Sequence, residues 1–225
     1  MSRHLKAYNA PKSWTILRKA HKWVLRPSPG AHPLVRALPI GLLLKQLGCG
    51  QTSREIKKVL NQKAVMIDGS VVKDIHHSTG FMDAISVKPS TSLRCTLDDK
   101  GRLKFIEAPA GEMNKKLCRI INKSVTKGGK IQLNLSDGRN ILAEKGAYAT
   151  GDTLLLEVPS QKILEHYPLA KGNTAFLVAG RHIGTIAPVE DIQGDKIWCG
   201  KGKEKIETLK QFAFIVGKDK PALKL

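Results

Sequence analysis

The chain has 225 residues, of which 41% are hydrophobic, so it is long enough to bury a core in one large domain or a few small ones. Its 38 lysines and arginines outnumber its 19 aspartates and glutamates, which gives a formal net charge of +19 at pH 7. Such an excess of cations predicts a polyanionic partner. No apolar run approaches the roughly 20 residues needed to cross a bilayer, which argues against a membrane protein.

Residues 1–38 are predicted to form a basic arm. The chain has no acidic residue before Glu55, and prolines interrupt any long helix or strand in the arm. We expect the arm to be extended, disordered when free and ordered on an anionic surface; the alternative is an inert solvated tail. Tryptophans interleave with the cations, and aromatic rings can stack on unpaired bases while cations contact phosphates. The candidate RNA-binding residues of the arm are Arg3, Lys6, Lys12, Trp14, Arg18, Lys19, Lys22, Trp23 and Arg26.

Residues 39–90 are predicted to form a small helix-hairpin module. A short apolar helix from Ile40 to Leu47 ends at glycines, and Thr52 with Glu55 has the spacing of a capping box for a second helix. Asp68-Gly69 then predicts a two-residue hairpin turn. The exposed cations expected to contact phosphate are Arg54, Lys57, Lys58 and Lys73.

Residues 91–170 are predicted to form a β-rich central domain. Asp98 to Gly101 reads as a hairpin turn, Gly111 to Cys118 as a short helix, and Ile131 to Leu135 alternates with the period of a strand. Lys127-Gly128-Gly129-Lys130 lacks the spacing of a nucleotide-binding phosphate loop, so it is interpreted as a basic turn between strands. The candidate phosphate contacts here are Lys127, Lys130 and Arg139.

Residues 171–225 are predicted to form a small β-barrel with a basic C-terminal segment. Strand-like runs surround a glycine-framed turn from Gly180 to Gly184, and Arg181 in that turn is a further candidate RNA contact. Taken together, the patterns predict an α+β multidomain protein in which strands dominate.

No catalytic, cofactor or metal site is predicted. The motifs of serine hydrolases, zinc proteases, zinc deaminases and dinucleotide-binding enzymes do not occur. The adjacent His76 and His77 have no further ligand at metal-binding spacing. The four cysteines are scattered and are expected to be buried reduced thiols of an intracellular protein, with disulfides or a metal site as the alternative. The N-terminus lacks the apolar core of a signal peptide, so we expect a cytoplasmic location.

Several stretches resemble one family in order along the chain. His4-Leu5-Lys6, Ala10 to Trp14, Lys22-Trp23-Val24 and Pro27 to Gly30 are similar to the N-terminal signature of the small-subunit ribosomal protein four of archaea and eukaryotes. The central and C-terminal segments that look like the same family are Gly80 to Asp83, Gly128 to Asn134, Asp137 to Asn140 and Phe214 to Lys218. The short chain looks more archaeal than eukaryotic.

The resemblance implies a function in the ribosome. Members have a basic arm, an RNA-binding helix-hairpin module, a β-rich domain and a KOW-type barrel, placed here on Thr174 to Ile186 with Gly184 as its characteristic glycine. The implied partners are small-subunit rRNA and neighbouring ribosomal proteins, with no small-molecule substrate. Two alternatives stay open: a KOW-type translation or transcription factor, and an RNA-modifying enzyme with the same module.

Overall fold

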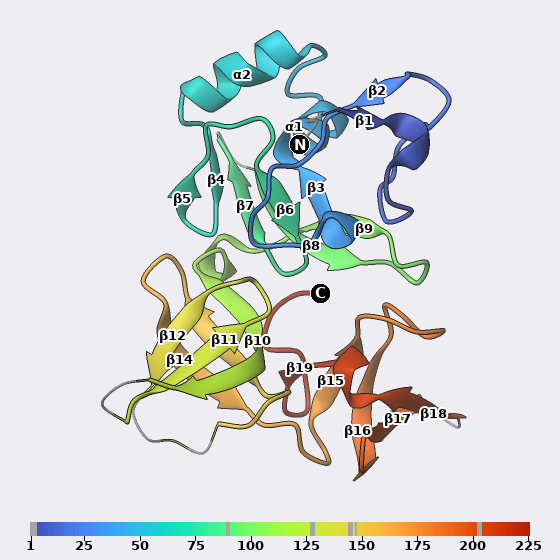
Figure 1. The fold of residues 1–225 in the computed structure, drawn as a ribbon, viewed down its shortest axis with the longest axis vertical. Helices are drawn as coiled ribbons and strands as arrows, with labels where there is room; N and C mark the ends of the chain where they lie inside the picture. The colour runs from blue at the N-terminus through green and yellow to red at the C-terminus, as the bar shows by residue number, and fades with distance from the viewer. Residues whose placement is uncertain (1–3, 89–90, 127–128, 144–145, 147, 202–203) are drawn as a thin grey trace. The chain divides into compact units, whose positions relative to one another are not determined.

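The computed structural model describes residues 4–88, 91–126, 129–143, 146, 148–201 and 204–225. The chain is β-rich, as predicted, with two α-helices among these residues (Figure 1). It divides into two compact units: unit 1 comprises residues 1–96 and 102–114, and unit 2 comprises residues 97–101 and 115–225.

Unit 1 is built on a five-stranded sheet and two helices. In sheet order its strands are β5 (Ser70–Val71), β4 (Val65–Ile67), β7 (Ala84–Val87), β8 (Thr91–Leu97) and β9 (Leu103–Glu107). The helices are α1 (Ile40–Gln46) and α2 (Ser53–Asn61). Smaller pieces of this unit are β1 (Leu5–Lys6) paired with β2 (Trp23–Val24), β3 (Ala37–Pro39) paired with β6 (Ser78–Gly80), and the 3₁₀ turns Ala7–Asn9, Leu34–Arg36 and Ala110–Glu112.

The capping box of α2 is confirmed. The Glu55 backbone N–H donates to the Thr52 hydroxyl at 3.3 Å, and the Thr52 backbone N–H donates to the Glu55 carboxylate at 3.4 Å. A hydrogen bond from the Gln51 backbone, followed by those from Thr52, holds the pKa of Glu55 below its usual value. These bonds satisfy backbone donors that would otherwise lack partners in the first helical turn, so the start of α2 is fixed locally.

The hairpin of β4 and β5 is also confirmed. Asp68 and Gly69 have φ values of 49° and 75°, the left-handed pair that a tight two-residue turn requires. The buried Asp68 carboxylate accepts a 3.0 Å hydrogen bond from the Ala84 backbone N–H of the neighbouring β7. The turn is therefore attached to the sheet as well as closed by its own geometry.

Two predictions for residues 91–118 were wrong in detail. Strands β8 and β9 extend the sheet of unit 1, although the sequence placed them with the central domain. The helix expected from Gly111 to Cys118 is instead a 3₁₀ turn followed by strand β10 (Lys115–Val125). Strand β8 pairs with the preceding β7, so the sheet of unit 1 continues past the boundary that the sequence placed at residue 90. In β10, residues Lys115 to Arg119 pair with the distant strand β13, and this pairing overrides the local helical pattern.

The N-terminal segment is folded onto unit 1, contrary to the expected free arm. Trp14 is only 3% exposed, and its indole N–H donates to the Ala37 carbonyl at 2.6 Å. The Leu103 backbone N–H donates to the Ser13 carbonyl at 2.9 Å, which fixes the segment against β9. An aromatic ring that looked available for base stacking therefore belongs to the core.

Unit 2 contains two five-stranded antiparallel sheets. The first consists, in sheet order, of β12 (Asn140–Ala143), β11 (Ile131–Leu135), β10, β13 (Thr153–Glu157) and β14 (Lys162–Tyr167). The second consists of β18 (Glu204–Leu209), β17 (Lys196–Lys201), β16 (Ile186–Gln193), β15 (Thr174–Leu177) and β19 (Ala213–Gly217), with the 3₁₀ turn Lys210–Phe212 before β19. A core that includes Ile120, Leu133, Leu154 and Leu156 lies under the first sheet.

None of the four cysteines forms a disulfide. Cys95, Cys118 and Cys199 are buried, and burial, together with the charge of Glu190, raises the pKa of the Cys199 thiol to about 11. In the described part of the chain, neither helix has the length and apolar character of a membrane span.

Replacing Trp14 tests whether the N-terminal segment is part of the fold. Trp14→Ala should lower the free energy of unfolding by about 3–5 kcal/mol, because it leaves a cavity and removes the donor to Ala37. Trp23→Ala, at a residue that is 52% exposed, is the matched control and should cost less than about 1 kcal/mol. Urea denaturation of both variants measures the difference; equal losses would show that Trp14 is not buried in solution.

Candidate nucleic-acid interface

Helix α2 presents a cationic face. Arg54, Lys57 and Lys58 are exposed, while Ile56 and Leu60 are fully buried against the rest of unit 1. Residues three and four positions apart lie on the same side of a helix, so the three cations can contact one phosphate backbone together. Lys73, which follows β5, is exposed as well.

The cations predicted in the arm differ in their availability to RNA. Lys6, Lys12, Lys19 and Lys22 are exposed and free to meet phosphates, and Arg26 is half-buried. Arg3 lies outside the described residues.

Arg18 differs from the other cations of the arm, because its guanidinium is hydrogen-bonded to backbone carbonyls of the protein. It donates to the carbonyl oxygens of Ala10 at 2.5 Å, Pro11 at 2.7 Å and Tyr8 at 3.3 Å. A guanidinium spread over three carbonyls holds the loop between residues 8 and 18 closed. Arg18 is therefore a structural residue in this fold.

Trp23, unlike Trp14, faces solvent, as does Tyr8 in the same segment. The Lys22 ammonium lies 5.5 Å from the centroid of its ring, and the ring of His4 lies at 5.6 Å with a tilted geometry. Trp23 borders a cavity of about 670 Å³ whose other walls include Leu17, Leu42 and Lys45, with no acidic side chain among the lining residues. The cavity has the mixed apolar and cationic character that suits a nucleobase and its phosphate.

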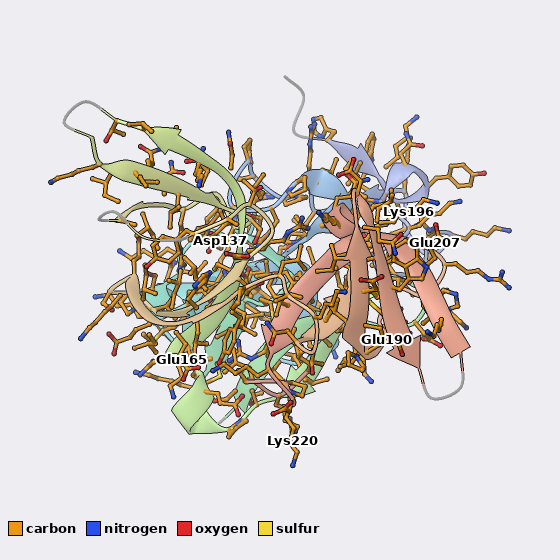
Figure 2. The ribbon with its side chains drawn as sticks, turned by 90° about the horizontal axis from the view of Figure 1, so that it is seen from below. Asp137, Glu165, Glu190, Lys196, Glu207 and Lys220 are labelled. Atoms are coloured by element: carbon orange, nitrogen blue, oxygen red, sulfur yellow. The ribbon has the colours of Figure 1, made fainter. Side chains whose placement is uncertain are left out.

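On the first sheet of unit 2, the predicted cations differ in availability. Lys130 is exposed at the start of β11. Arg139 instead pairs with the buried Asp137, which is labelled in Figure 2. The Arg139 Nε lies 3.3 Å from the Asp137 carboxylate, and the buried Lys116 ammonium lies 3.4 Å from the same oxygen. Lys127 lies outside the described residues.

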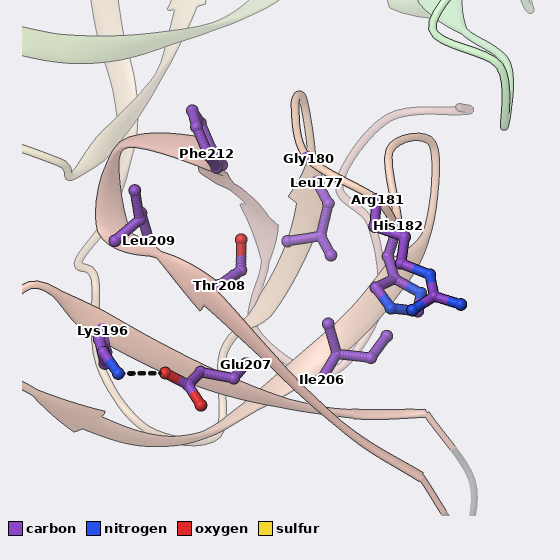
Figure 3. A pocket seen from close by; sticks show the side chains of 10 residues that line it. All are labelled: Leu177, Gly180, Arg181, His182, Lys196, Ile206, Glu207, Thr208, Leu209 and Phe212. Carbon is purple, nitrogen blue, oxygen red and sulfur yellow. Dashed lines mark ion pairs between the residues drawn. The ribbon is translucent and has the colours of Figure 1, made fainter.

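Arg181 is exposed in the turn between β15 and β16 of unit 2, at a pocket of about 410 Å³. Figure 3 shows Arg181 and His182 together on one side of this pocket, with Phe212 and Thr208 opposite. The exposed Lys196 in its wall is paired with Glu207 at 2.5 Å. Of the RNA-binding cations predicted from the sequence, Arg181 is the one that lines this pocket.

The described residues contain no cluster of three or more histidine, cysteine or acidic side chains able to hold a metal. His76, which invited a metal hypothesis, uses its Nδ1 atom in a 2.7 Å hydrogen bond with the Arg26 carbonyl oxygen.

Sequence reasoning considered only cations and aromatic rings, so it missed neutral candidates. Four amide side chains lie on the first sheet of unit 2: Asn122, Gln132, Asn134 and Asn140. The sequence shows that these amides alternate with apolar residues. It does not show the strand register, which places the amides of three strands side by side.

Comparison with known proteins identifies relatives over nearly the whole chain. The model of the ribosomal family S4e matches residues 90–163, and that of the RS4NT domain matches residues 1–35. The small ribosomal subunit protein eS4 of Methanocaldococcus jannaschii is 39% identical, covering 99% of this chain and 97% of that protein. The protein of the same name from Methanocella arvoryzae is 36% identical, covering 98% of this chain and 96% of its own length.

A solved structure agrees with the fold. The crystal structure of the 30S ribosomal protein S4e from Thermoplasma acidophilum is similar with a TM-score of 0.70 and 27% identity, covering 81% of this chain and 95% of that chain.

The structural role of Arg18 separates it from its neighbour Lys19. Arg18→Gln should destabilise the protein by about 1–3 kcal/mol and speed chymotrypsin cleavage after Tyr8 and Trp14, because three carbonyls lose a charged donor. Lys19→Gln, at an exposed site, should leave unfolding and cleavage unchanged. Urea denaturation and limited proteolysis compare the two; indistinguishable variants would refute the structural assignment.

Proposed function

This chain belongs to the eS4 family of small ribosomal subunit proteins, and we propose that it is a structural constituent of the small subunit that binds rRNA through many phosphate contacts. The similarity to named eS4 proteins over nearly the full length carries the proposal. The family consists of structural ribosomal proteins rather than enzymes. The site of action would accordingly be the small subunit in the cytoplasm, among rRNA and neighbouring ribosomal proteins.

Helix α2 and the hairpin of β4 and β5 would form the RNA-binding module of unit 1. The exposed Arg54, Lys57 and Lys58 support this role, since Ile56 and Leu60 are buried and the exposed Glu55 is engaged in the capping box at the start of α2. Phosphate contact should dominate because A-form RNA is read mainly through its shape, phosphates and 2′-hydroxyls.

The second sheet of unit 2 would be a KOW-type barrel motif at Thr174 to Ile186. Gly184 supports this placement: it has a φ of +80°, and a Cβ atom there would lie 2.7 Å from the Asp98 carbonyl oxygen. Only glycine fits such a site without a backbone shift. The adjacent turn would present Arg181 to RNA.

Sedimentation distinguishes this function from a free KOW-type factor. A constituent of the small subunit should stay with the subunit through a moderate salt wash on a sucrose gradient, whereas a factor should be stripped off. Nucleoside analysis of rRNA transcripts incubated with the protein covers the enzyme alternative, and newly modified bases would contradict a purely structural role.

Neutralising the cations of α2 tests the phosphate contacts. Lys57→Gln/Lys58→Gln should weaken binding to a small-subunit rRNA transcript and lower the slope of log K against log salt by about 1.4–1.8, since each phosphate contact contributes about 0.7–0.9. Lys57→Arg/Lys58→Arg keeps both charges and should retain the wild-type slope. Filter binding at several salt concentrations measures the slope for the wild type and both variants. A slope unchanged in the Gln variant would rule out α2 as a phosphate contact.

A further inference from the structure

Three strands of unit 2 bring uncharged polar side chains onto one face of a sheet. The register of β10, β11 and β12 places Asn122, Asn134 and Asn140 opposite one another across the three strands. A second row, two residues along, consists of Ser124, Gln132 and Leu142. We name the surface formed by these two rows the amide face.

The other side of the same strands is core. Leu133 is fully buried, Ala143 is 7% exposed, and Ile131 and Ile141 pack against the core cluster. Successive side chains of a strand point to opposite faces, so the amide face is directed away from this core. Asn122, Ser124 and Asn140 on it are exposed, and the two central amides are half-buried.

The composition of the amide face differs from that of an ordinary solvated sheet. A chain with 38 lysines and arginines has many cations for exposed strand positions, yet these two rows contain none. Their one large apolar side chain is Leu142, which is 61% exposed. A surface of amides with a single apolar residue favours a hydrogen-bonding partner over an apolar one.

The charges around the amide face indicate an anionic partner. Asp137 is the only acidic residue between positions 115 and 143, and it is 4% exposed and paired with Lys116 and Arg139. Lys130, directly before β11, is exposed and alternates onto the same side as Gln132 and Asn134. Lys123 is also exposed, but it lies opposite Leu133 in the register and therefore on the other side of the sheet, where its ammonium donates to the Tyr148 carbonyl oxygen at 3.0 Å. The described part of the three strands therefore presents Lys130 beside the amides and no exposed carboxylate. Phosphates can approach Lys130 without repulsion.

Amides also match the chemistry of one RNA surface. A side-chain amide both donates and accepts hydrogen bonds, as does a ribose 2′-hydroxyl, whereas lysine and arginine only donate. Three of the amides already make hydrogen bonds within the protein. Gln132 Nε2 donates to Asn134 Oδ1 at 3.2 Å, and Asn122 Oδ1 accepts from the Lys123 backbone N–H at 2.8 Å. Each retains further donor capacity for a ligand.

We infer that the amide face lies in the minor groove of an rRNA helix and hydrogen-bonds to 2′-hydroxyls and base edges there, while Lys130 contacts a flanking phosphate. The minor groove of A-form RNA is wide and shallow and displays these groups, so an extended sheet face can reach them; the major groove is too deep and narrow. The inference rests on the proposed rRNA binding and extends it from phosphate contact to recognition of RNA as RNA.

The test uses the full chain and three probes: a small-subunit rRNA transcript, a mixed-sequence RNA duplex of about 20 base pairs, and the DNA duplex of the same sequence. Asn122→Ala/Asn134→Ala/Asn140→Ala should weaken binding to both RNA probes by about tenfold or more, because three hydrogen-bonding side chains are lost. Binding to the DNA duplex should be unchanged, because DNA lacks the 2′-hydroxyl. The salt slope should also be unchanged, because amides neutralise no phosphate.

Two control variants show the opposite signatures. Lys130→Gln should lower the salt slope and weaken binding to RNA and DNA alike. Gln193→Ala removes an exposed amide from another sheet, at the end of β16, and should bind all probes as the wild type does. Should the triple variant not fold, as judged by circular dichroism, Asn122→Ala/Asn140→Ala removes only exposed side chains and should show the same selective loss.

Each other outcome overturns the inference. Unchanged RNA affinity, an equal loss on DNA, or a lower salt slope in the amide variant would exclude minor-groove recognition by this face. A variant that binds rRNA normally but dissociates from small subunits would assign the face to a protein neighbour instead. If the wild type itself does not bind rRNA, the proposed function fails together with the inference. If the wild type binds rRNA and the amide variants bind equally well, only the assignment of the amide face fails.

Discussion

Buried aspartates at turns are the interaction on which much of this structure depends. Asp68, Asp83, Asp137 and Asp152 are each at most 4% exposed. Each accepts a hydrogen bond from at least one backbone N–H, and three of them also contact a basic side chain or a histidine: Asp83 with His32, Asp137 with Lys116 and Arg139, and Asp152 with His166. A buried carboxylate is tolerated only when it is paired and hydrogen-bonded in this way. The scarce acids therefore close turns and anchor strands in both units.

This use of the acids has a consequence for the surface. Buried carboxylates cannot neutralise cations on the surface. The exposed lysines and arginine of α2, and the exposed lysines near the amide face, therefore keep their positive charge. Long-range attraction to a polyanion follows from charge alone, but it does not distinguish RNA from DNA. Neutral amides among the cations of unit 2 offer the short-range hydrogen bonds that could make this distinction. The two kinds of contact would then act together on one ligand.

Local signals in the sequence were sufficient for the elements that close within a few residues. The capping box of Thr52 and Glu55 and the turn at Asp68-Gly69 were predicted because their geometry depends on neighbouring residues. Long-range pairing was not predictable in the same way: β10 replaced an expected helix because it pairs with the distant β13. The domain boundary was also misplaced, because β8 pairs with the preceding β7 and continues the sheet of unit 1. Trp14 and Arg18 were taken for RNA contacts because residue type does not reveal burial or internal carbonyl partners. The amides were overlooked because only strand register groups them.

Exposed cations of both units should contact rRNA in the small subunit. Chemical crosslinking of assembled small subunits, followed by mapping of the linked peptides and nucleotides, tests this contact. RNA crosslinks are expected from the α2 peptide that contains Lys57 and Lys58 and from the peptide that contains Lys130. Crosslinks from these peptides to neighbouring proteins alone, with none to rRNA, would contradict it.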